Sequence, residues 1–153
     1  MLDNNMILRQ ATATESAQIF DLLLASRKQI GLSEKVTRTS AYIEAIARAC
    51  GNGVIWVLID LGKVVAFAKL GKLITERHQY VNIDYLVVSA KYRRQGYGKA
   101  LVRHIQELET TLTAEPRNEV STKLLRELGF VDDPDLTKRC CHLIMIWNDT
   151  PHQ

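Results

Sequence analysis

A strand that passes through a short basic turn into a helix constrains this chain more than any other feature. Residues 84–92 contain a β-rich apolar run, and residues 93–98 hold two arginines and two glycines. Apolar residues then recur at helical spacing over residues 97–109. Glycine allows backbone conformations closed to other residues, and a helix N-terminus presents unpaired N–H groups. The stretch therefore predicts an anion-binding elbow.

Two well-known phosphate-binding patterns fit this elbow poorly. A P-loop needs Ser or Thr after its Gly-Lys pair, whereas Ala100 follows Lys99. A dinucleotide-binding fingerprint needs a third small residue where Leu101 stands. A helix that simply starts in a basic surface turn, without a ligand, is the remaining alternative from these residues alone.

The turn and its surroundings resemble a known family. Residues 93–98, Arg-Arg-Gln-Gly-Tyr-Gly, resemble the acetyl-CoA-binding signature of the Gcn5-related N-acetyltransferase superfamily: Arg or Gln, two residues, Gly, one residue, then Gly or Ala. Residues 118–130, which begin at Asn and end in Leu-Gly-Phe, resemble the later helix of that family. The resemblance implies an enzyme that transfers acetyl from acetyl-CoA to the primary amine of a small molecule, peptide or protein.

The order of predicted elements agrees with this resemblance. Hydrophobic patterns predict an α+β fold of order β-α-α-β-β-β-α-β-α-β. The resemblance implies a mixed, mainly antiparallel sheet, flanked by about four helices, that splays open between its fourth and fifth strands. We expect one domain over residues 1–148 and a flexible tail at 149–153. Predicted strands are 6–10, 54–59, 64–74, 80–88, 111–115 and 140–147; predicted helices begin near Thr12, Ser40, Tyr97 and Asn118, and residues 32–39 form a loop.

The resemblance also implies where the cofactor binds. The backbone of the fourth strand would pair with the pantetheine arm as an added strand would, and the N–H groups of residues 94–99 would surround the pyrophosphate. Asn118 has a second explanation as a helix N-cap. The full set of expected cofactor-binding residues is Leu86, Val87, Val88, Arg93, Arg94, Gln95, Gly96, Tyr97, Gly98, Lys99 and Asn118.

Two residues are expected to serve the chemistry. Asp84 stands where the family commonly has an acid, so it is the candidate general base; the alternative is a solvated or ion-paired strand residue. The backbone N–H near Val88 is the natural donor to the oxyanion. Leu125 occupies the position where many members carry a general-acid tyrosine. The proton for the thiolate then comes from Tyr85, Ser121, Tyr97 or water, unless the thiolate leaves unprotonated or the protein binds CoA without efficient catalysis.

Composition limits the kinds of location, partner and metal site that we expect for the protein. The net charge of +3 is mild, and the sequence shows neither a signal-peptide pattern nor a membrane-spanning apolar run, so we expect a soluble cytoplasmic protein without a membrane or nucleic-acid partner. The three cysteines lack disulfide-framework or zinc spacing, so no metal is expected. The resemblance implies acetyl-CoA and an amine acceptor as partners; a homodimer is compatible with the sequence, which does not fix the oligomeric state.

Two rival functions stay open from the sequence. The first is a non-catalytic acyl-CoA-binding or sensing module, suggested by Leu125. The second is a nucleic-acid or protein-interaction domain that uses the basic residues 91–99, and it predicts salt-dependent nucleic-acid binding that CoA does not displace.

Overall fold

A computed structural model describes residues 5–149 of the chain and contains one seven-stranded sheet. Strands run in the spatial order β1-β2-β3-β4-β5-β7-β6, and only the β4–β5 pair is parallel. The α+β prediction with a mixed, mainly antiparallel sheet is confirmed. The strands are β1 Met6–Gln10, β2 Ile55–Asp60, β3 Lys63–Ile74, β4 Gln79–Val88, β5 Thr111–Ala114, β6 Val131–Asp132 and β7 Met145–Asn148.

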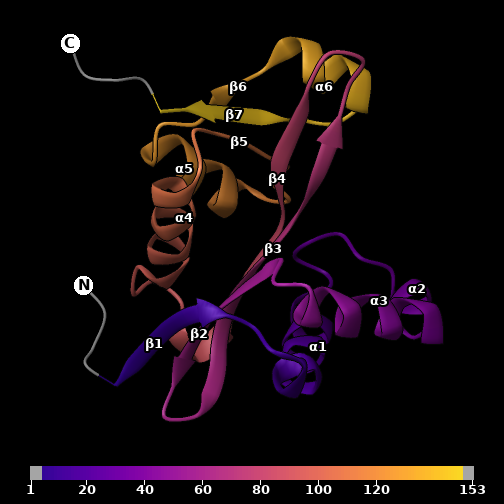
Figure 1. Ribbon diagram of the computed structural model, residues 1–153, viewed down its shortest axis with the longest axis vertical. Coiled ribbons are helices and arrows are strands. Elements are labelled where there is room, and N and C mark those ends of the chain that lie inside the picture. The colour runs from indigo at the N-terminus through magenta and orange to yellow at the C-terminus, as the bar shows by residue number, and fades with distance from the viewer. Residues whose placement is uncertain (1–4, 150–153) are drawn as a thin grey trace.

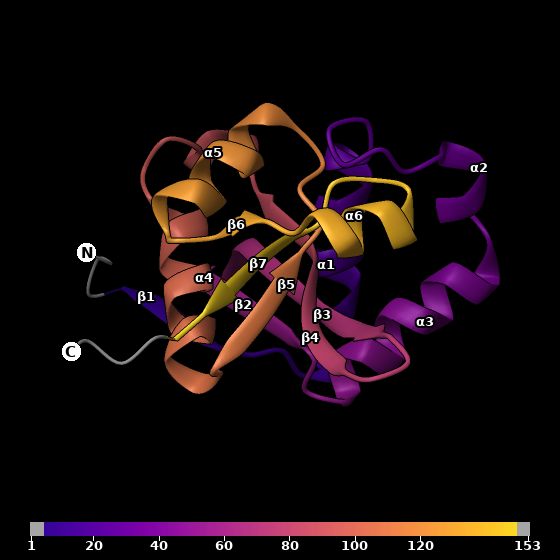
Figure 2. The same cartoon turned by 90° about the horizontal axis from the view of Figure 1, so that it is seen from above.

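Helices cover both faces of the sheet. Figure 1 shows α1 and α3 on one side of the long β3–β4 hairpin, with α4 and α5 on the other. Seen from above, α6 lies at the end of the sheet near the hairpin tip (Figure 2). The helices are α1 Ser16–Ser26, α2 Glu34–Thr37, α3 Ser40–Gly51, α4 Tyr97–Leu108, α5 Glu119–Glu127 and α6 Pro134–Cys140, with 3-10 turns η1 at Ala13–Glu15 and η2 at Ala90–Tyr92.

The β2–β3–β4 meander forms the centre of the core. Its strands are rich in β-branched and aromatic residues, which pack well on a pleated surface. Val57 and Phe67 are fully buried in a cluster with α1 and α3, while Ala68 and Ile83 face a second cluster beneath α4 and α5. Burial on both faces explains why these strands are almost continuously apolar.

The parallel pair β4–β5 is short. It joins Val81 to Leu112, Asn82 to Thr113 and Ile83 to Ala114, and β5 ends at Ala114. Beyond Ile83, residues 85–88 of β4 therefore have a sheet partner only in β3. The predicted opening between the fourth and fifth strands is present.

The structure corrects several predicted elements. The strand predicted at residues 140–147 is instead the end of α6, a loop and the shorter β7. Asp133 caps α6 by accepting a hydrogen bond from Leu136 N–H, and Pro134 occupies the first turn, so local capping outweighs the apolar pattern. The predicted loop at 32–39 contains α2, and with α6 the described residues form six α-helices rather than about four. Residues 131–132 form the additional strand β6.

The expected tail lies mostly outside the described residues. Asp149 is described, and its N–H donates to Thr110 C=O at 2.8 Å. None of the helices within residues 5–149 is long and apolar enough to cross a membrane.

A buried carboxylate fixes the start of the first helix. Glu15 lies in η1 and forms a capping box with Thr12, because its Oε1 accepts a hydrogen bond from Thr12 N–H at 2.9 Å. Arg9 Nη1 lies 2.6 Å from the same oxygen. This arginine contact, with hydrogen bonds from neighbouring threonines, lowers the pKa of Glu15 to about 2 against the cost of burial. The pair ties β1 to α1.

Candidate functional site

The elbow between β4 and α4 is a row of unpaired backbone donors. Arg94 and Gly96 both have left-handed backbones, with φ of 64° and 83°. Within residues 5–149, none of the backbone N–H groups from Arg94 to Lys99 donates to a protein acceptor; the first bond of the helix runs from Ala100 N–H to Gly96 C=O at 3.0 Å. Successive N–H groups in such a turn, at a helix N-terminus, form a site suited to phosphate oxygens.

The two glycines of the elbow are required for different structural reasons. A Cβ on Gly96 would meet no atom within 4 Å, so this position needs glycine for its positive φ. A Cβ on Gly98 would meet Leu124 Cδ1 at 3.1 Å and the side chains of Leu86 and Val88 at 3.6 Å. Gly98 therefore allows α4 to pack closely on α5 and β4.

The side chains of the elbow are unequally available. Arg93 donates from Nε to Val88 C=O at 3.1 Å and from Nη2 to Gln29 Oε1 at 2.7 Å. Lys99 pairs with Glu127, and this hydrogen bond holds the pKa of Glu127 below its usual value. Arg94 is exposed and has no ion pair or side-chain hydrogen bond within the described chain, so it is the arginine most available to an anion.

The open edge of β4 presents backbone groups. Ser89 N–H donates to Val65 C=O of β3 at 2.8 Å. Because neighbouring residues of a strand direct their backbone groups to opposite edges, the N–H and C=O of Val88 and of Leu86 face away from β3. The side chains of Leu86 and Val88 join the core cluster of Leu101, and Val87 is buried on the α1 side. The edge can thus pair with an extended ligand while its side chains pack inside.

The start of α5 closes the other side of the opening. Asn118 caps α5, because its Oδ1 accepts from Ser121 N–H at 2.8 Å. Its Nδ2 also donates to Gln29 C=O at 3.2 Å. Gln29, from the turn after α1, therefore holds Arg93 through its side chain and Asn118 through its backbone.

A pocket lies where β4 and β5 diverge. Asp84 and Leu86 come from the unpaired part of β4, and the segment after β5 supplies the opposite wall. The pocket is lined by Ile30, Ile83, Asp84, Leu86, Ala114, Glu115, Pro116, Arg117, Asn118, Ser121 and Leu125.

A β-bulge aims Asp84. Lys69 pairs with Tyr85 and Leu70 pairs with Ile83, so Asp84 is an extra residue in β4. Its Oδ2 lies 2.8 Å from Lys69 Nζ, and its Oδ1 accepts from Asn82 Nδ2 at 2.8 Å. The carboxylate rests above Gly71, where a Cβ would lie 2.3 Å from Oδ2. Lys69 and Asn82 thus hold the Asp84 carboxylate in place, and the absence of a side chain at Gly71 leaves room for it.

Tyr85 lies at the centre of a second polar group. Lys69 Nζ is 5.9 Å and Arg117 Cζ is 5.4 Å from the centroid of its ring, within range of cation–π attraction. Burial raises the pKa of the Tyr42 phenol, and the neighbouring Tyr85 hydroxyl adds to this rise. Arg117 Nη1 lies 3.3 Å from Glu115 Oε1, which His142 Nε2 approaches at 3.0 Å.

The position of the family's general-acid tyrosine and the alternative proton donors lie in different surroundings. Leu125 lines the pocket but is buried in the core, so an apolar side chain stands at this position. Ser121 Oγ is occupied in the α5 cap with Asn118. The Tyr97 hydroxyl donates to Gln95 Oε1 at 3.0 Å. Neither Tyr97 nor Tyr85 lines the pocket, although Tyr85 lies beside Arg117, which does.

Sequence reasoning missed five residues of this region. Gly71 carried a usable signal, because an isolated glycine inside a strand pattern marks a bulge or a close approach. Lys69 breaks an apolar strand, which is a weaker indication. Gln29, Tyr42 and Arg117 reach the site only through the tertiary fold, and no local pattern distinguishes them.

Comparison with known proteins agrees with this geometry. The model of the acetyltransferase (GNAT) family matches residues 17–130. A search of curated proteins found no match. Among solved structures, N-acetylglutamate synthase from Neisseria gonorrhoeae, complexed with coenzyme A and N-acetyl-glutamate, has a TM-score of 0.73 and 20% identity over 98% of this chain. The match covers 36% of that chain, so this protein spans about a third of the synthase.

Two similar structures match along their full length or nearly so. Arylalkylamine N-acetyltransferase 2 from Aedes aegypti has a TM-score of 0.73 and 13% identity, over 96% of this chain and 100% of that one. PaiA N-acetyltransferase from Thermoplasma acidophilum, in complex with coenzyme A, has a TM-score of 0.65 and 14% identity, over 94% and 98%. These likenesses show the fold, and the family model covers well over half of the sequence. The chain belongs to the acetyltransferase (GNAT) family.

Proposed function

We propose that this protein binds acetyl-CoA at the elbow and transfers its acetyl group to a primary amine by direct attack. The observation that carries the proposal is the row of unpaired N–H groups from Arg94 to Lys99 beside the open edge of β4. These donors suit a pyrophosphate, and the edge suits the amides of a pantetheine arm. Two structures of the same fold are complexes with coenzyme A.

The expected cofactor residues divide into three roles. Leu86, Val87 and Val88 supply the strand edge. The N–H and C=O of Leu86 and the N–H of Val88 are available to pantetheine, whereas Val88 C=O already accepts from Arg93 Nε. Residues 94–99 supply backbone donors, and Arg94 adds a free guanidinium. Arg93, Lys99 and Asn118 hold the surrounding elements in place through Gln29 and Glu127.

Asp84 is proposed as the general base. Bound acetyl-CoA would supply the thioester carbon that the amine attacks; the N–C bond forms, the C–S bond breaks, and the products are an amide and the CoA thiol. Asp84 would take the ammonium proton directly or through water. Its contact with Lys69 keeps the carboxylate in position. The Val88 N–H, which faces the opening, is the proposed donor to the oxyanion.

The proton for the departing thiolate needs a separate source. Tyr85 stays the candidate among the side chains, since Leu125 is apolar and Ser121 and Tyr97 are hydrogen-bonded elsewhere. Water is the alternative donor. The leucine at position 125 also motivates the second candidate function, a non-catalytic acyl-CoA-binding module. That function predicts cofactor binding without turnover of any amine.

Two measurements test the proposal. Acetyl-CoA at a hundredfold excess over its dissociation constant should stabilise the folded protein by roughly 2.7 kcal/mol, seen as a higher unfolding temperature. Thiol release should then depend on an added amine. Absence of a thermal shift at millimolar acetyl-CoA would reject the cofactor site. A shift without thiol release across a broad amine panel would favour the binding module.

A further inference from the structure

Two buried polar atoms near the pocket have no partner. Within residues 5–149, Tyr42 Oη and Arg117 Nε are buried and make no hydrogen bond with the protein. An arginine Nε can only donate, and a phenol can donate as well. Buried polar groups are normally satisfied, so an exception requires an explanation. A ligand that offers acceptor oxygens would supply the missing partners.

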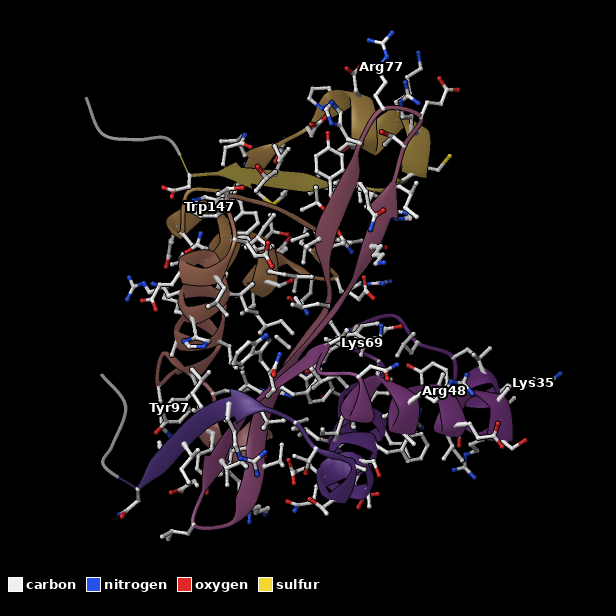
Figure 3. All side chains as sticks on the ribbon, in the orientation of Figure 1. Lys35, Arg48, Lys69, Arg77, Tyr97 and Trp147 are labelled. Atoms are coloured by element: carbon white, nitrogen blue, oxygen red, sulfur yellow. The ribbon has the colours of Figure 1, made fainter. Side chains whose placement is uncertain are left out.

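The two atoms belong to one side-chain group that adjoins Asp84. Arg117 lines the pocket together with Asp84, and its guanidinium lies over Tyr85, the neighbour of Tyr42. Lys69, which holds Asp84, lies beside the same Tyr85 ring. Figure 3 shows Lys69 midway along the β3–β4 hairpin, towards α3, and far from Arg77 at the hairpin tip. The unpaired donors are therefore close to the proposed base.

The charges of this region limit what can bind. Lys69 is paired with Asp84, and Arg117 is paired with Glu115, so these four groups sum to zero. His142, beside Glu115, adds a positive charge only when it is protonated. A zwitterion preserves that balance, because its ammonium can face Asp84 while its carboxylate faces Arg117. A diamine would add two positive charges without a free carboxylate, and a phosphate would add a second negative charge.

We propose that the acceptor is an amine that also carries a carboxylate, as amino acids do. Arg117 and Tyr42 would bind the carboxylate, and the amine would lie at Asp84. Planar arginine groups match carboxylates well, and hydrogen bonds to charged groups are the stronger kind. This inference rests on the proposed function, since it names the substrate of the same site.

Matched acceptors test the inference. Thiol release is measured with the twenty amino acids and γ-aminobutyrate, each beside its carboxamide, at saturating acetyl-CoA. We expect kcat/KM for the best acid to exceed that of its carboxamide at least about tenfold. Arg117→Gln and Tyr42→Phe should remove this preference through a higher acceptor KM, with an unchanged dissociation constant for acetyl-CoA. Arg103→Gln, at an exposed position of α4, should keep it.

The outcomes separate this inference from the proposed function. If carboxamides or simple amines are equal or better substrates, or if Arg117→Gln keeps the preference, the carboxylate site is wrong and the enzyme assignment stands. If neither acetyl-CoA binding nor turnover occurs, the proposed function fails. Calorimetry with the same acids then decides the inference, because an absence of binding at millimolar concentration overturns it and binding that Arg117→Gln abolishes supports it.

Discussion

Replacing Gly71 with alanine should displace the proposed base without touching the elbow. The new Cβ would lie 2.3 Å from Asp84 Oδ2, 2.7 Å from Oδ1 and 2.8 Å from Cγ. Non-bonded carbon contacts are comfortable at about 3.5 Å, so the carboxylate must move by roughly 1 Å. That movement separates it from Lys69 Nζ and Asn82 Nδ2, each now at 2.8 Å.

A displacement of this size has a predictable kinetic effect. A misplacement of about 1 Å in a catalytic group can lower the rate about a hundredfold. We therefore expect the Gly71→Ala enzyme to lose roughly that factor in kcat, with weaker dependence of the rate on pH. Its affinity for acetyl-CoA should stay the same, because Gly71 lies on β3, away from residues 94–99. Loss of two hydrogen bonds to a charged group should lower the free energy of unfolding by about 1–3 kcal/mol.

The assay needs a glycine control and a binding readout. A Cβ at Gly51, the last residue of α3, meets nothing within 4 Å, so Gly51→Ala should keep full activity. Thiol release gives kcat over a range of pH, and the thermal shift with acetyl-CoA shows that each variant is folded. Activity of Gly71→Ala within threefold of the wild type, with the same pH profile, would refute the argument that Asp84 must occupy this position.

Three further outcomes are expected. Asp84→Asn should lower kcat and remove the acidic limb of the pH–rate profile with acetyl-CoA affinity unchanged; an unaltered profile would exclude Asp84 as the base. Arg94→Glu should weaken acetyl-CoA binding at least about tenfold by calorimetry, whereas normal binding would count against the elbow. The pKa of Glu15 is about 2 in the folded chain against an ordinary 4.5, so its stabilisation is complete above about pH 4.5 and lost as pH falls towards 2. Urea unfolding between pH 6 and 3 should show this loss, up to about 3 kcal/mol over the full range, and Glu15→Gln should reduce it.

Much of the fold follows from local sequence patterns. The β-branched run at residues 54–59 can hardly form anything but a buried strand, and the elbow is defined by its glycines and by the helical stripe that follows. The prediction for α6 was wrong because it gave more weight to the apolar residues after Cys140 than to the helix start at Asp133 and Pro134. A seven-residue helix buries little, so its signal is mainly its cap.

The site was predictable only in part. Asp84 was predicted because the family that the sequence resembles commonly has an acid at this position, yet the bulge that orients it depends on the pairing of β3 with β4. Gly98 is expected to bind the cofactor through its backbone, and its neighbours show a second reason for glycine, which is close packing of the helix. Tyr42 and Arg117 are distant in the sequence and become neighbours only when α3 packs beside the segment after β5.

The position of Gln29 has a consequence for how the two substrates affect each other's binding. Gln29, in the turn after α1, contacts both Arg93 at the elbow and Asn118 at the start of α5. A cofactor that fills the opening would restrain these two elements and, through Gln29, the turn that leads to α2. Because linkage is reciprocal, any gain in acceptor affinity from bound acetyl-CoA must equal the gain in acetyl-CoA affinity from bound acceptor. Each substrate would then bind more tightly when the other is present, and Gln29→Ala would reduce this mutual gain equally for both substrates.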